Sequence, residues 1–156
     1  MPIYVRKASE TDIDDIYRLI AELAEYERAG HELILTSADL LQHFKSGYFK
    51  AWVARYENQT VGMALCYDRY STWKGRSLYL EDIIVQEKYR RIGAGSALMR
   101  TLISYARREG YFSINWQVLT WNEPALHFYK KWNAEIDRQW WNGRIIINNS
   151  DNNESI

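Results

Sequence analysis

The sequence contains very little cysteine and proline and no long hydrophobic run. Its 156 residues include one cysteine and two prolines. A single cysteine excludes an intrachain disulfide framework and favours a reducing compartment, so we expect a cytoplasmic protein. No stretch is apolar enough to span a bilayer, and the first residues, MPIYVRKASE, lack the apolar core of a signal peptide. The formal net charge is zero, which predicts no general attraction to nucleic acid or to a membrane.

The composition is that of one globular domain with a well-filled core. Hydrophobic residues make up 47% of the chain and aromatic residues 15%, and the length suits a single domain. The charge is uneven along the chain. Residues 1–32 hold eight acids against four bases, whereas residues 86–110 hold six bases against two acids. Such a chain could hold a cation beside a polyanion, although solvated helix faces would give the same pattern.

The spacing of apolar residues predicts alternating strands and helices. We expect strands over residues 3–7, 49–56, 60–70, 78–85 and 112–120, and helices over residues 12–26, 37–47, 93–109 and 122–132. Ser37 and Asn122 are the expected N-caps of the second and last helices, and Gly110 fits the end of the third. Gly62 suggests a β-bulge, and Ile136 and residues 143–148 are candidates to close the sheet. This order indicates an α/β domain with a mixed sheet.

One turn has the features of an anion site. The residues Arg90-Arg91-Ile92-Gly93-Ala94-Gly95 follow a predicted strand and open the longest predicted helix. Free amide groups at a helix N-terminus attract anions, and glycines let the backbone come close to phosphate oxygens. The turn lacks the third glycine of a dinucleotide fingerprint and the lysine of a P-loop. Alone, it is equally compatible with phosphate binding and with a simple tight turn.

Four segments taken together resemble the GNAT acetyltransferase superfamily. The Arg90–Gly95 turn matches the family's Q/R-x-x-G-x-G/A motif. Three further segments, Glu-Leu-Ala-Glu-Tyr-Glu (22–27), Tyr-Leu-Glu-Asp (79–82) and Trp-Asn-Glu-Pro followed by Phe-Tyr-Lys (121–130), are similar to the spermidine/spermine and thialysine N-acetyltransferase branch. The resemblance spans about residues 3–135. It implies one GNAT domain over residues 1–148, with about six to seven strands and about four helices, and a polar tail over residues 149–156.

The resemblance implies a catalytic pair, Tyr129 and Glu81. Tyr129 would act as the general acid that protonates the departing thiolate, because a phenol with a pKa near ~10 holds its proton at neutral pH. Otherwise Tyr129 is a core residue beside Phe128. Glu81 would act as base through water, although an ammonium near pKa ~10.4 cannot simply pass its proton to a carboxylate near ~4.3. Asp82 beside it is unusual within an apolar strand, because a carboxylate placed there for packing alone is costly.

The resemblance also implies contacts to acetyl-CoA. No metal is expected, because His31, His43 and His127 do not have the spacing of metal ligands. The implied cofactor contacts are Ile83, Ile84, Val85, Arg90, Arg91, Ile92, Gly93, Ala94, Gly95, Ser96, Asn122, Pro124, Ala125 and Tyr129. A backbone N–H of residues 83–85 could polarise the thioester carbonyl. Otherwise these three side chains are core, and Asn122 is a plain N-cap. The implied substrate contacts are Tyr26, Glu27, Glu81, Asp82 and Trp73. The family often forms dimers, so a homodimer is expected.

The sequence differs from the spermine-acetylating members of the family at positions where they have acidic residues. Asp137-Arg138-Gln139-Trp140-Trp141 replaces their C-terminal acidic pair, and Ser71 stands where they have an aspartate. Fewer acids favour a shorter amine such as thialysine, a lysine-like compound or a small diamine. Two alternatives stay open, namely acetylation of protein N-termini or lysines and a non-catalytic acyl-CoA-binding module. An acetyl-cysteine intermediate on Cys66 is disfavoured because no histidine partner is evident in the sequence.

Overall fold

The computed structural model describes residues 2–147. By its contacts the chain divides into two compact units, residues 1–117 and residues 118–156. The expected polar tail over residues 149–156 lies outside the described residues. No helix within the described part of the chain is long and apolar enough to cross a bilayer.

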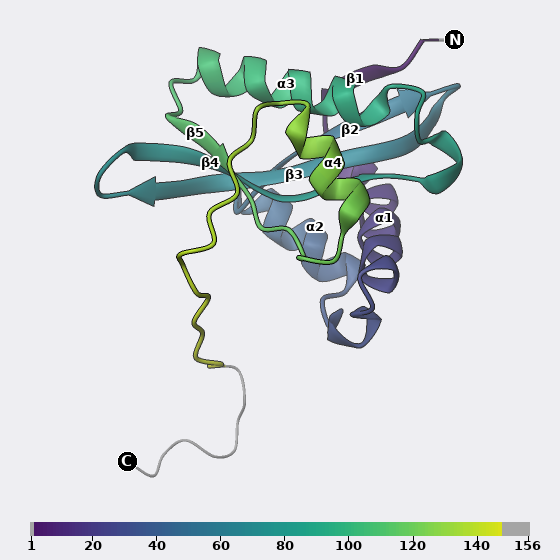
Figure 1. The fold of residues 1–156 in the computed structure, drawn as a ribbon. Helices are drawn as coiled ribbons and strands as arrows, with labels where there is room; N and C mark the ends of the chain where they lie inside the picture. Colours follow the sequence, from purple (N-terminus) through teal and green to yellow (C-terminus); the bar gives the residue numbers. More distant parts are fainter. Residues whose placement is uncertain (1, 148–156) are drawn as a thin grey trace. The chain divides into compact units, whose positions relative to one another are not determined.

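The first unit contains a five-stranded mixed sheet. Its strands are β1 (Tyr4–Lys7), β2 (Lys50–Tyr56), β3 (Gln59–Ser71), β4 (Gly75–Val85) and β5 (Ser113–Asn115), in that spatial order (Figure 1). The first four strands pair antiparallel, and β5 runs parallel to β4. The expected α/β fold with a mixed sheet is therefore confirmed. Among the described residues, however, the sheet has five strands rather than six to seven.

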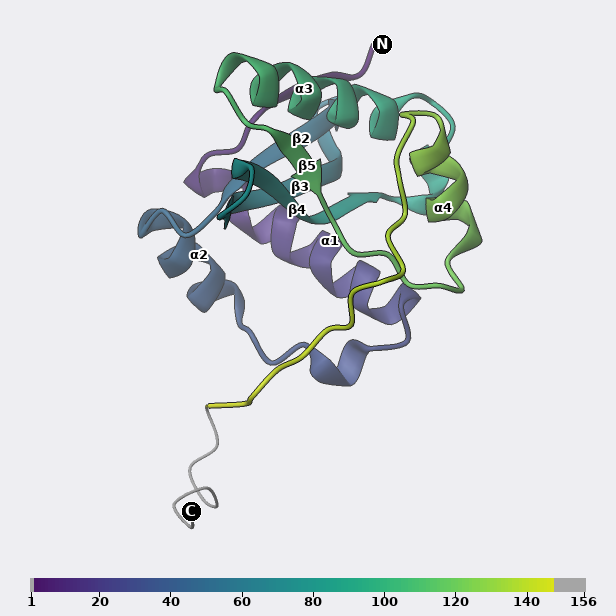
Figure 2. The same cartoon turned by 60° about the vertical axis from the view of Figure 1, so that its left-hand side comes forward.

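Three helices cover the two faces of this sheet. Helices α1 (Ile13–Tyr26) and α2 (Ser37–Lys45) lie on one face, and α3 (Ala94–Arg108) lies on the other (Figures 1 and 2). Each is amphipathic, and its apolar stripe faces the sheet. Ile16 and Leu19 of α1, and Leu98 and Leu102 of α3, have no solvent exposure. Short 3₁₀ turns lie at Glu10–Asp12, Gly30–Glu32 and Glu87–Tyr89.

Local turn chemistry explains the β2–β3 hairpin. Glu57 and Asn58 both have positive φ, 46° and 64°, which a two-residue hairpin turn of the favoured hand requires. The register passes from Arg55–Thr60 to Ala54–Gly62 and leaves Val61 as an extra residue, so the predicted bulge lies beside Gly62. A Cβ atom on Gly62 would come within 2.8 Å of the Ile84 carbonyl oxygen, so this position favours glycine.

Three local predictions need correction. The N-cap of α2 is Thr36, whose hydroxyl accepts a hydrogen bond from the Asp39 backbone N–H, and not Ser37. The strand expected over residues 112–120 is formed only at Ser113–Asn115. Ile136 and residues 143–147 form no strand, and Asn148 lies outside the described residues. Whether a strand forms, and how long it is, depends on long-range partners, which local spacing does not reveal.

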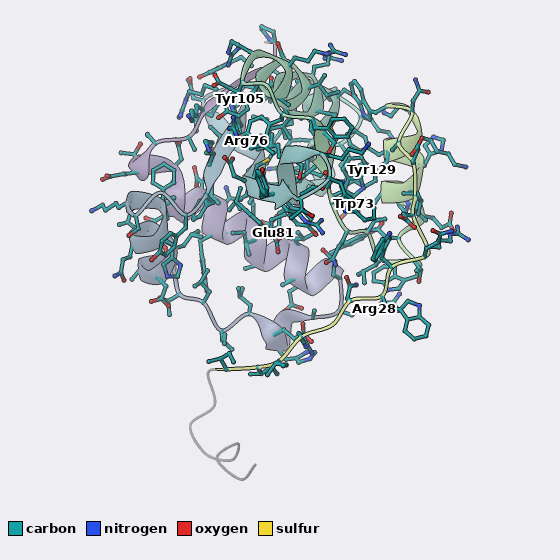
Figure 3. The ribbon with its side chains drawn as sticks, turned by 90° about the vertical axis from the view of Figure 1, so that its left-hand side faces the viewer. Arg28, Trp73, Arg76, Glu81, Tyr105 and Tyr129 are labelled. Atoms are coloured by element: carbon teal, nitrogen blue, oxygen red, sulfur yellow. The ribbon has the colours of Figure 1, made fainter. Side chains whose placement is uncertain are left out.

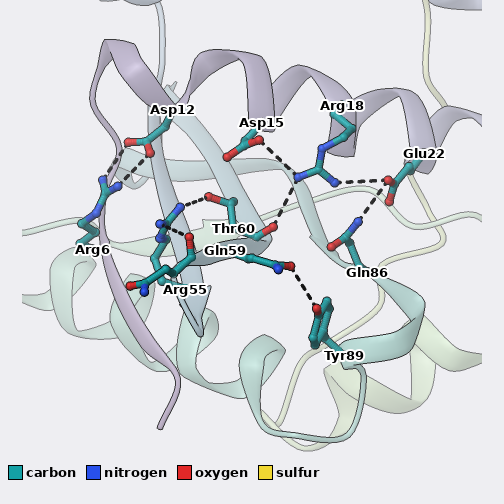
Figure 4. A network of polar contacts seen from close by, with 11 residues as sticks. Arg6, Asp12, Asp15, Arg18, Glu22, Arg55, Gln59, Thr60, Gln86 and Tyr89 are labelled. Carbon is teal, nitrogen blue, oxygen red and sulfur yellow. Dashed lines mark hydrogen bonds and ion pairs between the residues drawn. The ribbon is translucent and has the colours of Figure 1, made fainter. Parts of the chain in front are cut away.

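An ion pair between the partly exposed Arg6 and the buried Asp12 fixes the start of the first unit. Both guanidinium NH₂ groups of Arg6 donate to the Asp12 carboxylate, at 2.7 and 2.8 Å (Figure 4). The Ser9 backbone N–H donates to the same carboxylate at 2.8 Å. The hydrogen bonds from Arg6 lower the pKa of Asp12 from its usual value, against the opposing effect of burial. This contact joins β1 to the 3₁₀ turn that leads into α1.

The second unit contains α4 (Glu123–Lys130). The Asn122 side chain accepts a hydrogen bond from the Ala125 backbone N–H at 3.3 Å, and Pro124 lies in the first turn. The predicted N-cap is confirmed. Asn133 has a φ of 56°, the left-handed conformation that asparagine tolerates.

Candidate active site

A β-bulge places Glu81 and Asp82 in different environments. Asp82 pairs with Leu65 of β3 and Leu80 pairs with Cys66, so Glu81 is the extra residue of β4. Bulges re-aim side chains and interrupt the regular alternation of a strand. Glu81 is exposed to solvent, whereas Asp82 is partly buried. The two adjacent carboxylates therefore lie in different environments.

An acidic cluster is formed by residues from the end of α1 and from the middle of β4. Its members are Glu27, Glu81 and Asp82. Burial raises the pKa of Asp82 to about 7, and the charges of Glu81 and Glu27 add to the effect. Burial likewise raises the pKa of Glu27, which directly follows α1. The fold thus brings together three of the five predicted substrate contacts.

Two tyrosines beside this cluster were not identified from the sequence. The rings of Tyr67 and Tyr79 lie with their centroids 5.1 Å apart. Burial raises the pKa of both phenols, and the charge of Glu81 raises both further. Tyr79 lies two residues before Glu81, and side chains two residues apart lie on the same face of a regular strand. The alternation of side chains could therefore have predicted that Tyr79 lies near Glu81. Tyr67 lies on β3, and only the strand register places it beside Tyr79.

The predicted anion turn follows the acidic strand β4 after the 3₁₀ turn at Glu87–Tyr89. Arg91 and Gly93 have positive φ, 70° and 92°, and α3 begins at Ala94. The backbone N–H groups of a helix's first turn have no intrahelical acceptor and point outward. A Cβ atom on Gly93 would meet nothing within 4 Å, so the turn is open above this residue. Together with the exposed Arg91, this arrangement has the features of an anion site.

Arg90 and Tyr26 connect the anion turn to the acidic cluster. The Arg90 Nε donates to the Val85 carbonyl oxygen at 3.2 Å, which fixes the side chain against the end of β4. Its guanidinium carbon lies 5.4 Å from the centroid of the Tyr26 ring. Tyr26 is the last residue of α1 and directly precedes Glu27. A predicted cofactor contact and a predicted substrate contact are therefore neighbours in the structure.

The end of β4 has an edge that β5 does not cover. The parallel pairing of β5 with β4 involves only Ser77, Leu78 and Tyr79 of β4. Ile83, Ile84 and Val85 pair with β3 on their other side. Within residues 2–147 no strand pairs with this edge of β4 beyond Tyr79. Backbone groups of residues 83–85 could therefore meet an extended ligand, as the family resemblance implied.

The remaining predicted cofactor contacts lie on α4 of the second unit. Tyr129 is 7% exposed, and its ring packs edge-on against Phe128 at 5.5 Å between centroids. Asn122, Pro124 and Ala125 form the start of the same helix.

Trp73 lies away from the acidic cluster. It is 84% exposed at the tip of the β3–β4 hairpin, which faces the viewer in Figure 3. Glu81 lies six residues beyond Gly75 along β4, a span of about 20 Å at ~3.3 Å per residue. The Ser71 hydroxyl accepts hydrogen bonds from the backbone N–H groups of Trp73 and Lys74, at 3.2 and 3.1 Å. The first unit therefore does not bring Trp73 to Glu81, and the Ser71 side chain stabilises the turn.

The structure gives no support to chemistry at the cysteine. Cys66 is buried, and burial raises its thiol pKa to about 12, so the thiol is protonated at neutral pH. Among the described residues, no group of three or more His, Cys, Asp or Glu side chains is placed to hold a metal ion.

Comparisons with known proteins agree with this geometry. The family model of the Acetyltransferase (GNAT) family matches residues 13–134, and the chain belongs to this family. The thialysine N-epsilon-acetyltransferase of Mus musculus is 36% identical over 136 residues, covering 81% of this chain and 80% of that protein. The spermidine/spermine N(1)-acetyltransferase-like protein 1 of Homo sapiens is 32% identical and matches 80% of this chain but 19% of that protein.

The fold has close counterparts among solved structures. An aminoglycoside acetyltransferase from an uncultured soil metagenomic sample superimposes with a TM-score of 0.78, covering 93% of this chain and 96% of that one at 20% identity. At this identity the likeness shows the fold alone. The fold therefore agrees with the chain's membership of the Acetyltransferase (GNAT) family.

Proposed function

We propose that this protein transfers the acetyl group of acetyl-CoA to a primary amine of a small molecule, with thialysine-like amino acids as the preferred class. The acidic cluster of Glu27, Glu81 and Asp82 beside the Arg90–Gly95 turn carries this proposal. A cationic amine is attracted to the cluster, and a polyanion to the turn. The similarity to the mouse thialysine N-epsilon-acetyltransferase supports the same substrate class.

The residues of each unit suggest a division of roles. Acetyl-CoA supplies the activated acetyl thioester. The start of α3, from Arg91 to Ser96, holds its pyrophosphate, and a backbone amide of residues 83–85 holds the carbonyl oxygen. The Tyr129 phenol donates a proton to the departing thiolate, which is within the ordinary scope of general-acid catalysis.

The two adjacent carboxylates differ in how they can handle the proton of the amine. Glu81 is exposed and can pass a proton to water. Asp82, with its pKa of about 7, can hold a proton near neutral pH, which narrows the gap to an alkylammonium near ~10.4. We propose that Glu81 manages the proton and that Asp82 and Glu27 bind the substrate's positive charge.

An acetyl-CoA thiol-release assay tests this function. The substrates are thialysine, lysine, a small diamine, spermidine and a peptide with free N-terminal and lysine amines. The proposal predicts the highest kcat/KM for thialysine or another short amine. Preference for the peptide would instead support a protein acetyltransferase. Coenzyme A binding without turnover of any amine would support a non-catalytic binding module.

We also propose a homodimer in the cytoplasm that has neither nucleic acid nor a membrane as partner. The C-terminal segment exposes apolar side chains that a second copy could cover. Trp141, Ile145 and Ile147 are 95%, 83% and 86% exposed. The zero net charge and the single cysteine support the other two points. Light scattering of the purified chain checks the dimer, since a monomer at micromolar concentration would contradict it.

A further inference from the structure

A basic pocket lies on the first unit, away from the residues assigned to acetyl transfer. It has a volume of about 330 Å³, which is near the lower end of the range for small-molecule sites. Strand β2 contributes one residue and α3 the others. The lining residues are Trp52, Arg100, Thr101, Ser104, Tyr105 and Arg108.

Two aromatic residues, Trp52 and Tyr105, form one part of the pocket wall. Trp52 is 4% exposed, and its ring packs edge-on against Tyr105 with the centroids 4.9 Å apart. Tyr105 lies in the last turns of α3, and its ring reaches Trp52 of β2 on the sheet face that this helix covers (Figure 3). The Thr101 hydroxyl donates to the Ala97 carbonyl oxygen at 2.8 Å, which leaves its own oxygen able to accept a hydrogen bond. A planar ligand group could therefore pack against a preformed surface.

Positive charge surrounds this aromatic wall. The Lys7 ammonium and the Arg108 guanidinium both lie over the Tyr105 ring, 5.8 and 5.7 Å from its centroid. Arg100 lies two helical turns before Arg108 on the same side of α3. Among the described residues, no carboxylate pairs with Lys7 or Arg100. Arg108 has only a long, exposed contact to Glu109 at 3.7 Å. The three cations repel one another, and an anion between them would relieve that repulsion.

The pocket is distinct from the anion turn at the start of α3. Arg100 lies seven residues beyond Gly93 along the helix, about 10 Å away, and Arg108 about 22 Å away, at ~1.5 Å per residue. One helix therefore presents its N-terminal amides at one end and a basic pocket along its later turns. The second feature plays no part in the proposed acetyl transfer.

We propose that this pocket binds a small phosphomonoester that carries a planar ring, the chemical class of the nucleoside monophosphates. Arginine presents a planar fork of N–H donors that matches phosphate oxygens, and the Ser104 hydroxyl between the two arginines adds a donor. The ring of the ligand packs on the Tyr105 side. Because the pocket is open, the expected dissociation constant is on the order of 0.1–1 mM.

Calorimetric titration of the full chain tests this site. Coenzyme A is left out because it carries an adenine and a phosphomonoester of its own, and the titration is repeated with Arg91→Ala to show that the turn at the start of α3 is not the site measured. The probes are AMP, inorganic phosphate and adenosine. AMP is expected to bind more tightly than phosphate, and adenosine at least tenfold more weakly than AMP. No AMP binding, or adenosine binding equal to that of AMP, would overturn the proposal.

Two matched variants distinguish a specific contact in the pocket from the general positive charge of α3. Arg100→Glu is expected to weaken AMP binding at least tenfold. Arg107→Glu makes the same charge change on α3 outside the pocket lining and is expected to change it less than twofold. Equal weakening by both would overturn the proposal. The thermal unfolding midpoint of each variant checks that it folds. If Arg100→Glu does not fold, the neutral variant Arg100→Gln replaces it and is expected to weaken AMP binding about threefold to tenfold.

Discussion

Glu81 and Asp82 are consecutive on β4, yet only Asp82 has a partner in the β3 register, Leu65. The bulge leaves Glu81 in solvent and Asp82 partly buried, near Glu27. In a regular strand the two side chains would point to opposite faces. The bulge in addition interrupts the hydrogen-bond ladder between β3 and β4 at Glu81. The consequence is one carboxylate free to exchange protons with water and another whose pKa is raised to about 7.

Asp82→Asn is expected to stabilise the protein at pH 8. The pKa of Asp82 is raised on folding, so the folded state binds the proton more tightly than the unfolded chain. Stability is therefore lost as pH rises from about 4 through about 7, and the buried charge is costly above that range. Urea unfolding at pH 8 and pH 4 measures the difference between variant and wild type, which should be positive at pH 8 and should shrink at pH 4.

The same variant is expected to bind the amine substrate less well. Removing the carboxylate removes attraction to the ammonium, so KM for the amine should rise at least severalfold at pH 8. Replacing a functional residue whose buried charge is costly commonly gives an enzyme that is more stable but less active. If Asp82→Asn leaves KM unchanged, Asp82 has no substrate role.

Arg91→Ala is expected to raise KM for acetyl-CoA about tenfold and to change kcat less than about threefold. A charge-assisted hydrogen bond to phosphate contributes about 1.5–3 kcal/mol when shielded, and less at an exposed position. Steady-state kinetics measures both constants. Arg107→Ala is the control because it removes an exposed arginine at the other end of α3. The assignment of the turn fails if both variants have the same effect.

Tyr129→Phe is expected to lower kcat by about 10²-fold, within the range for loss of a general acid. The substitution keeps the ring that packs on Phe128, so the unfolding midpoint should change little. Tyr70→Phe, at an exposed position of the β3–β4 hairpin, is the matched control and should keep full activity. Wild-type turnover in Tyr129→Phe with a good substrate would remove Tyr129 from the mechanism.

Asp12→Asn is expected to lower the free energy of unfolding at pH 7 by about 1.5–3 kcal/mol, the usual contribution of hydrogen bonds to a charged group. Because folding lowers the pKa of Asp12, its contribution is complete above about pH 4 and is lost as pH falls through the folded pKa. Urea unfolding across this range measures the loss. Asp15→Asn, which breaks only an exposed contact with Arg18, should cost less than about 1 kcal/mol.

Local patterns in the sequence predicted part of this structure well. The apolar spacing of residues 13–26 depends only on the helix period, and the capping of α4 by Asn122 depends only on residues three apart. The bulge at Glu81 and the early end of β5 could not be predicted in the same way. Both depend on how strands distant in sequence align, and nothing within residues 78–85 or 112–120 determines that alignment.

The candidate site was predicted to a similar extent. Glu27, Glu81 and Asp82 were expected to contact the substrate, and the fold brings them together. Tyr67 was missed because it reaches the site only through the pairing of β3 with β4. Trp73 was expected there from family resemblance, but the length of the hairpin places it at the far end of β4.

The most direct test of small-amine acetylation is the product formed from thialysine and acetyl-CoA that carries a deuterated acetyl group. Mass spectrometry and NMR identify how many acetyl groups are transferred and to which nitrogen. The account predicts one deuterated acetyl group on the side-chain amine, formed by wild type about 10²-fold faster than by Tyr129→Phe. Absence of any acetylated small amine across the substrate panel, with coenzyme A bound normally, would contradict it.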